Sequence, residues 1–251
     1  MDHCRGTAGE EYLADAGFGD APGRADERVA GVLAPGFVDV HCHGGGGAAF
    51  GLRGAFGFGD AAGFDLLAVK PIDAIPIDDV VATAGVAKGS FFNHFADKQA
   101  FASAIASEVR IELESQVTRA NAGVTDPVER IAGGMLVGAR FAIDNPKRTT
   151  VLLRSHGNST ARSHPLNKGL VDDFEAACAQ GLLRREARDS GVLYWLGLCQ
   201  ILMSNLVERK LDRSAADRRI AEMIILGLTG LGVDYSDAAT LAARLACARP
   251  R

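Results

Sequence analysis

The fold of this chain is decided by residues 76–95, which read PIDDVVATAGVAKGSFFNHF. The first half of the stretch predicts a short helix that turns Ile77, Val80 and Val81 inward. That helix is expected to end at Gly85, because glycine tolerates the left-handed backbone of a tight turn. A second short helix, from about residue 87 to residue 94, then leaves at a steep angle. The stretch therefore predicts a helix-turn-helix.

The second short helix carries two kinds of side chain. Phe91 and Phe95 are four residues apart and are expected to pack inward together. Short polar side chains point outward and suit phosphates and base edges. The outward residues are Lys88, Ser90, Asn93 and His94. This face is polar rather than strongly basic, so it predicts nucleic-acid binding through a few placed contacts.

These residues resemble the signature of the TetR (tetracycline-repressor) family of bacterial transcription regulators. The matching elements are Ala84-Gly85-Val86, Lys88-Gly89-Ser90 and Phe92-Asn93-His94-Phe95-Ala96-Asp97-Lys98. The resemblance implies an all-α fold: a three-helix DNA-binding head at 60–113, a helical ligand-binding and dimerisation body at 114–235, and a tail at 236–251. It implies that DNA is bound by Lys88, Gly89, Ser90, Phe92, Asn93, His94 and Lys98. In that arrangement Phe92 lies at the DNA backbone and Lys98 holds a phosphate.

Helical patterns continue through the rest of the chain. The first helix is expected at residues 60–70 and ends at Pro71. A long helix with an apolar residue at every fourth position begins near Asp97, and the next is bounded by Asp126-Pro127 and Asn145-Pro146. Further helices are predicted at about 146–155, 166–180, 188–208 and 215–232.

The stretch from residue 191 to residue 207 is apolar nearly all round, which suits a helix shared between a ligand cavity and a subunit contact. The predicted ligand pocket contains Trp195, Cys199, Gln200 and Met203. The helices at 188–208 and 215–232 are predicted to form half of a four-helix dimer interface that includes Ile224 and Leu228. Polar residues interrupt the apolar stretch, and it falls short of the roughly 20 residues that cross a bilayer, so no membrane span is expected.

The first 59 residues differ from the rest of the chain. Residues 1–63 hold 16 of the 30 glycines and carry a net charge of −5, whereas the remaining 188 residues carry +1. Apolar periodicity is missing there, so an irregular or disordered segment is the expectation. A domain boundary is predicted near residue 60.

Residues 29–50 contain a motif of a different kind. A short strand ending at Val40 would turn His41 and His43 to the same side, where two imidazoles can bind one metal. The segment resembles the first-strand motif of the amidohydrolase superfamily, as in N-acetylglucosamine-6-phosphate deacetylase. Such a site is completed by a barrel of at least about 200 residues of alternating strand and helix, and helices are predicted here instead. We therefore expect no catalytic site, no metal site at these histidines and no cofactor.

Composition limits the remaining function classes. The chain has 27 Lys and Arg against 31 Asp and Glu, which excludes a protein that coats nucleic acid by bulk charge. Five cysteines without a CxxC pair fit a reducing cytoplasm. The expected function is a non-enzymatic, ligand-responsive repressor that binds a palindromic DNA operator as a homodimer and responds to an unknown small-molecule effector. The alternatives are a metal-dependent deacetylase fragment and a helical dimer that has lost DNA binding.

Overall fold

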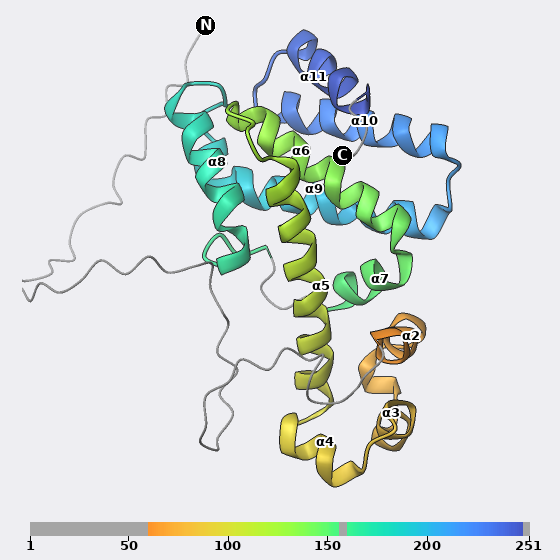
Figure 1. Cartoon of the computed structure of the whole chain (residues 1–251). Coiled ribbons are helices and arrows are strands. Elements are labelled where there is room, and N and C mark those ends of the chain that lie inside the picture. The colour runs from red at the N-terminus through yellow and green to blue at the C-terminus, as the bar shows by residue number, and fades with distance from the viewer. Residues whose placement is uncertain (1–59, 156–159, 248–251) are drawn as a thin grey trace, which may run out of the picture. The chain divides into compact units, whose positions relative to one another are not determined.

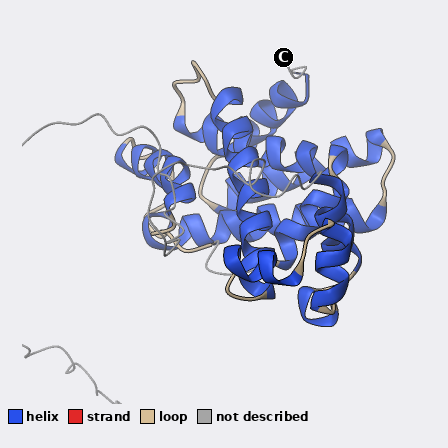
Figure 2. Cartoon of the chain, turned by 60° about the horizontal axis from the view of Figure 1, so that its bottom comes forward, coloured by secondary structure: helices blue, strands red, loops and turns tan. Residues whose placement is uncertain are grey.

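Helices form all the regular structure of the described chain (Figures 1 and 2). The computed structural model describes residues 60–155 and 160–247, so the interpretations of residues 1–59, including the strand and histidine motif, lie outside it. The elements are α2 (Asp60–Val69), η1 (Ile72–Ala74), α3 (Ile77–Ala84), α4 (Lys88–His94), α5 (Lys98–Ala120), α6 (Pro127–Asp144), α7 (Pro146–Arg154), η2 (Pro165–Asn167), α8 (Lys168–Ala179), α9 (Ala187–Arg209), α10 (Arg213–Gly230) and α11 (Tyr235–Cys247). The described residues contain no strand, and the all-α prediction is confirmed.

Local capping explains where the long helices begin. The Asp97 carboxylate accepts a hydrogen bond from the Ala100 backbone N–H at 2.7 Å at the start of α5. At the start of α6, Asp126 accepts from the Val128 N–H at 2.8 Å, and Pro127 occupies the first helical position. Each carboxylate satisfies a backbone donor that has no partner within the helix. The boundaries predicted from these residues are therefore correct.

Two hydrophobic cores hold the helices together. The first joins the head to the neighbouring ends of the body helices and contains Phe64, Leu67, Ile75, Val80, Val81, Phe91, Phe101, Ile105, Ala106, Val109, Leu113, Phe141, Ala142, Val151 and Met203. The second lies among α6, α8, α9, α10 and α11. The helix α5 runs from the head into the body, and the boundary predicted at residue 113 falls inside this helix.

The C-terminal segment differs from its prediction. A tail was expected over residues 236–251, but α11 occupies most of it and packs on α10 and α6. Its apolar residues follow helical spacing at Ala238, Leu241, Ala242 and Leu245, a signal that the sequence contained. Arg244 also pairs with Glu129 of α6 at 2.6 Å. The helix is stable because its apolar stripe is buried against the body.

Candidate nucleic-acid interface

The turn between α3 and α4 has the geometry that residue 85 predicts. Gly85 adopts φ +66°, in the left-handed region, and a Cβ placed on it would meet no atom within 4 Å. Glycine is therefore required by the backbone conformation and not by lack of space. The Val86 N–H donates to the Val81 carbonyl at 3.0 Å and closes the turn. The helix-turn-helix prediction is confirmed in this local geometry.

An aromatic cluster fixes α4 against the head. Phe91 is fully buried, and its ring centroid lies 5.4 Å from that of Phe95 and 5.5 Å from that of Phe101 in α5. Edge and tilted arrangements at these separations are favourable for aromatic pairs. The inward positions predicted for Phe91 and Phe95 are thus found, and they set the orientation of the opposite face of α4.

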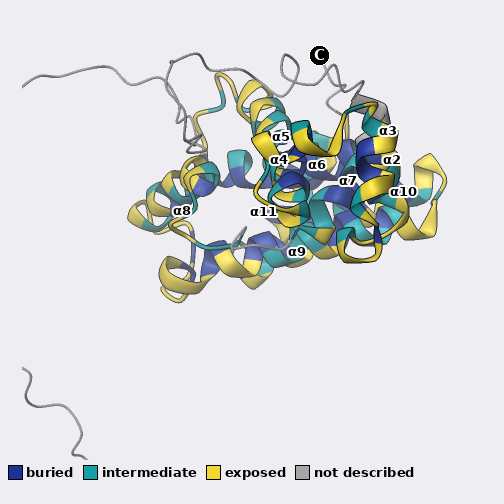
Figure 3. Cartoon of the chain, turned by 90° about the horizontal axis from the view of Figure 1, so that it is seen from below, coloured by how far each residue is buried: buried dark blue, intermediate teal, exposed yellow. Residues whose placement is uncertain are grey.

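That opposite face is open to solvent. The exposed residues of α4 are Lys88, Gly89, Phe92, Asn93 and His94, and Ser90 beside them is half-buried. Figure 3, which views the molecule from below Figure 1, shows α3 and α4 from this side. The helix is short, and Phe91 is its one buried residue. This face can approach a groove of duplex DNA without moving the head core.

A carboxylate lies next to the first cation of this face. The Lys88 ammonium pairs with Asp78 of α3 at 2.9 Å, and both side chains are largely exposed. Asp78 and Asp79 occupy the first turn of α3, where the helix dipole favours negative charge. A phosphate that approaches Lys88 must therefore compete with a neighbouring carboxylate.

Lys98 has a partner that the sequence did not reveal. Its ammonium donates to the Ile75 carbonyl at 2.7 Å and to the Asp73 carbonyl at 3.3 Å. These carbonyls belong to the segment at and just after η1, so Lys98 ties this segment to the start of α5. A lysine ammonium has three donors, and the third remains compatible with a phosphate contact.

Residues 61–105 match the family model described as bacterial regulatory proteins, tetR family. These residues form a TetR-family DNA-binding domain. The matched residues extend from α2 into α5 and include the whole helix-turn-helix. The resemblance stated from Ala84 to Lys98 is therefore confirmed for this domain.

Solved structures show that the TetR fold extends beyond the head. A gamma-butyrolactone receptor described as ArpA-like is 22% identical, with a TM-score of 0.50, over 74% of this chain and 94% of the receptor. RolR in complex with resorcinol is 19% identical, with a TM-score of 0.52, over 76% and 93%. A transcription regulator assigned to the tetR family from Shewanella sp. PV-4 is 14% identical, with a TM-score of 0.61, over 70% and 96%. No curated protein matches the chain.

In this TetR fold, helix α7 of the body holds helix α2 of the head. The Lys147 ammonium pairs with the Asp65 carboxylate at 2.6 Å. The Arg148 guanidinium lies 4.9 Å from the centroid of the Phe64 ring, within the range of a cation–π contact. Sequence reasoning missed these residues, because lysine and arginine on a short helix carry no signal of what they face.

The predicted pocket residues lie in different surroundings. Trp195 is buried in the body core, and a Cβ on Gly227 of α10 would lie 2.6 Å from its ring. Met203 belongs to the core shared with the head, and Cys199 and Gln200 are half-buried between them along α9. None of these four residues lines the cavity against α8 and α9 or the cavity between α2, η1, α5 and α7. Their role in ligand binding stays a prediction.

A buried polar cluster lies beside Cys199. The Arg110 guanidinium pairs with Glu114 at 2.8 Å and donates to the buried Asn167 side chain at 2.8 Å, while its Nε is buried with no acceptor. Burial raises the pKa of Glu114, and the nearby Arg110 lowers it in part. Burial also raises the pKa of Cys199 to about 12, so its thiol is protonated at neutral pH. Such a thiol is a poor nucleophile.

One cavity against α8 and α9 is lined by Arg162, Phe174, Glu175, Cys178, Arg188 and Asp189. Its Arg162 pairs with Glu175 at 2.7 Å. The other cavity lies between α2, η1, α5 and α7. No group of three or more histidine, cysteine or acidic residues suited to a metal ion occurs among the described residues, and His41 and His43 lie outside them.

The outer faces of α9 and α10 expose apolar side chains. Leu193 and Ile201 of α9 are 61% and 65% exposed, and Leu226 of α10 is 63% exposed. In contrast, Ile224 and Leu228 are buried at 1% and 0%. The prediction that these two residues lie in the dimer contact is therefore wrong, because they face the core of their own subunit.

By length and composition alone, α9 is apolar enough to cross a membrane, which is weak evidence by itself. This helix packs against α6, α7, α8 and α10, and 39% of its most apolar 18-residue stretch is buried. Packing in the body accounts for its buried residues, while Leu193 and Ile201 are among its exposed apolar side chains.

Proposed function

We propose that the protein is a homodimeric transcriptional repressor that reads a palindromic operator with α4 and releases it when a small molecule binds the helical body. The observation that carries the proposal is the exposed polar face of α4, held in a fixed orientation by the buried Phe91. A helix anchored in this way can enter the major groove as a rigid unit.

Each residue of the face has a role set by its chemistry. Asn93 can contact an adenine through two hydrogen bonds, which makes it the candidate for sequence preference. Lys88 and Lys98 are candidates for phosphates, which position the protein but carry no sequence information. Gly89 lets the backbone approach closely, and Phe92 offers an apolar contact to the sugar–phosphate backbone. Ser90 and His94 complete the polar surface.

Dimerisation is supported by the apolar stripe on α9 and α10. Leu193, Ile201 and Leu226 are exposed on adjacent helices, and an exposed apolar surface of this kind is typical of a subunit contact. Two copies of the pair would form a four-helix bundle. A two-fold dimer would present two α4 helices to half-sites about one helical turn apart, roughly 34–36 Å.

The response to a small molecule is supported by the fold and by the cluster around Arg110. The structures of similar fold include a gamma-butyrolactone receptor and RolR with the ligand resorcinol. Here the unpaired Nε of Arg110 is a buried donor, and an unsatisfied buried donor costs about 1–3 kcal/mol. An effector that offers an acceptor oxygen between α5 and α9 would remove this cost. On α9, Cys199 interacts electrostatically with Arg110 and Glu114, and Cys199 and Gln200 are the candidate contacts for such an effector.

The proposal places a soluble, non-enzymatic regulator in the cytoplasm. A helical dimer that has lost DNA binding is the second candidate, and one observation favours it. Residues 64–98 hold three lysines and five aspartates, and Lys88 is already paired with Asp78. The two candidate functions differ in whether the protein prefers any DNA sequence.

The deciding experiment is selection of operator sequences from a random duplex library by the full-length protein. We expect enrichment of a palindrome, and recovery of no preferred sequence would favour the second candidate. On the selected duplex, Asn93→Ala should weaken binding by about 1–3 kcal/mol and relax the preference at one position. Lys98→Ala should weaken binding almost uniformly across sequences and reduce its salt dependence.

Two controls make the lysine result specific. Lys98→Arg retains a cation that can donate to the Ile75 carbonyl, so it separates loss of charge from loosening of the head. Lys168→Ala removes an exposed, ion-paired lysine from α8 and should leave DNA binding unchanged. Unchanged affinity and salt slope in Lys98→Ala would show that Lys98 has only its structural role.

A further inference from the structure

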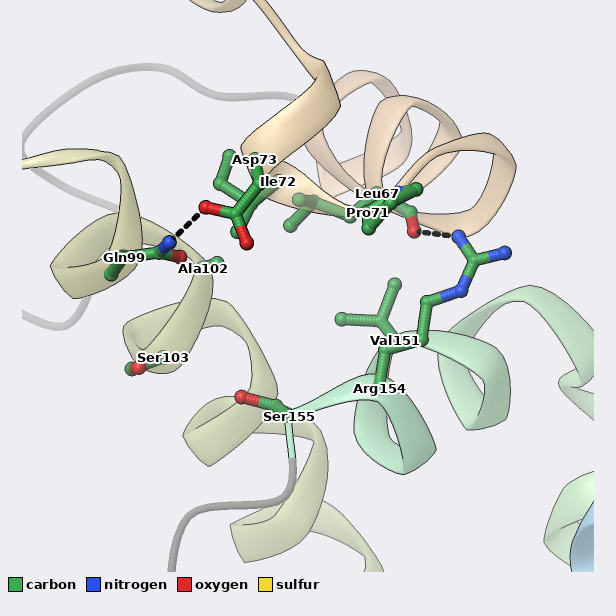
Figure 4. Close-up of a pocket in the computed structure, with 10 residues that line it drawn as sticks. All are labelled: Leu67, Pro71, Ile72, Asp73, Gln99, Ala102, Ser103, Val151, Arg154 and Ser155. Atoms are coloured by element: carbon green, nitrogen blue, oxygen red, sulfur yellow. Dashed lines mark hydrogen bonds between the residues drawn. The ribbon is translucent and has the colours of Figure 1, made fainter.

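A cavity of about 280 Å³ lies where the head meets the body (Figure 4). Its walls come from α2 and η1 of the head and from α5 and α7 of the body. The lining residues are Leu67, Pro71, Ile72, Asp73, Gln99, Ala102, Ser103, Val151, Arg154 and Ser155. Its volume is at the lower limit for sites of drug-sized ligands, so it suits a smaller molecule.

Arg154 forms one side of this cavity. Its Nη1 donates to the Leu67 carbonyl at 2.7 Å. That carbonyl lies in the last turn of α2, where its regular partner would be the backbone N–H of residue 71. Residue 71 is proline and has no N–H, so Arg154 supplies the missing donor. The guanidinium has five N–H groups, and this bond uses one of them.

Asp73 forms the opposite side. Its carboxylate accepts a hydrogen bond from the Gln99 side-chain amide of α5, and Figure 4 shows this pair across the cavity from Arg154. Both Asp73 and Arg154 are exposed, so solutes can reach them. Asp73, which can bind a cation, and Arg154, which can bind an anion, thus line two sides of the same cavity.

The remaining lining is mostly apolar. Buried Leu67 and Val151 lie between the charged sides, together with Ile72 and Ala102. The hydroxyl groups of Ser103 and Ser155 lie at the lower side in Figure 4. A ligand that matches all of these groups carries one negative charge, one positive charge and a short apolar portion.

We propose that this junction cavity binds a small zwitterion whose two charges are separated by a short apolar chain, of the ω-amino acid class. Its carboxylate pairs with Arg154 and its ammonium pairs with Asp73, while the chain between them contacts Leu67 and Val151. Such a ligand bridges η1 of the head and α7 of the body. The site is separate from the body site around Arg110, and its binding of a ligand can be measured without DNA.

Isothermal titration of the full-length protein tests the proposal with 4-aminobutanoate and 6-aminohexanoate as probes. Two analogues of 6-aminohexanoate each lack one charge: hexanoate has no ammonium and hexylamine has no carboxylate. We expect at least one amino acid to bind and both analogues to bind at least about tenfold more weakly. No binding of either amino acid overturns the proposal, and so does equal binding of hexanoate.

Variants locate the binding in the cavity. Asp73→Asn changes an exposed side chain and should weaken the binding of the amino acid by about tenfold or more. Arg154→Gln should have the same effect. Arg185→Gln, on an exposed residue outside the cavity lining, serves as the control and should bind normally. If Arg154→Gln unfolds the head, Asp73→Asn alone decides. Unchanged binding in Asp73→Asn overturns the assignment.

Discussion

The head and the body expose opposite kinds of surface. In the head, α4 exposes the polar Lys88 and Asn93 over a buried aromatic anchor. In the body, α9 exposes Leu193 and Ile201 beside the buried Trp195. A polar face is stable in water and available to a charged partner, whereas exposed apolar area is disfavoured by about 25 cal/mol per Å². The chemistry of an exposed face, and not its exposure alone, therefore indicates its partner.

The largest effect should come from a charge placed inside the body. Leu228→Asp or Ile224→Asp buries a carboxylate in the core, and we expect a loss of about 4–5 kcal/mol or failure to fold. Leu226→Asp is the matched control on the same helix, because Leu226 is 63% exposed. This variant should keep its thermal stability as a protomer and sediment as a monomer. A stable dimer of Leu226→Asp would place the subunit contact elsewhere.

A second pair of variants applies the same comparison to the head. Phe91→Ala removes a fully buried ring and should lower the free energy of unfolding by about 3–5 kcal/mol. Its neighbour Phe92 is 49% exposed, so Phe92→Ala should cost much less and act mainly on DNA affinity. Thermal unfolding followed by circular dichroism measures the difference. Equal destabilisation by the two changes would contradict the orientation of α4.

A smaller effect is expected at the edge of the polar face. Asp78→Asn removes the carboxylate that pairs with Lys88, and exposed pairs of this kind contribute only about 0–1 kcal/mol to stability. Folding should therefore change little, while DNA affinity should rise a few-fold, and more at low salt. Asp172→Asn, which releases Lys168 in the body, is the matched control. A decrease in affinity would show that Asp78 itself positions Lys88 for DNA.

The smallest effect concerns the cluster around Arg110. Burial raises the pKa of Glu114, so the folded state binds the proton on this carboxyl more tightly than the unfolded state does. The stabilisation of the folded state by this protonated carboxyl is complete below the ordinary pKa of 4.5. It is lost as the pH rises through the raised pKa of Glu114. Relative to Glu114→Gln, the wild type should therefore lose stability between pH 4.5 and pH 7. Denaturant titrations of both proteins at several pH values measure this, and an opposite slope would mean that Arg110 dominates.

The sequence by itself determined the helix-turn-helix and most helix boundaries. Gly85 specifies a left-handed turn, Asp97 and Asp126 cap helices, and the spacing of Phe91 and Phe95 sets an inward side. These are interactions between residues a few positions apart, so the residue types alone predict them. The sequence also contains the local apolar pattern of α11, although it was interpreted as a tail.

Only the tertiary structure decided which groups meet across the chain. It placed Lys98 on the Ile75 carbonyl, Arg154 on the Leu67 carbonyl and Leu226, rather than Ile224, on the outer face of α10. The last distinction arises because the stripe of α10 that becomes buried depends on how α9 and α11 pack against it. Contacts of this kind join segments that lie tens of residues apart, and no local pattern encodes the partner of a long cationic or apolar side chain.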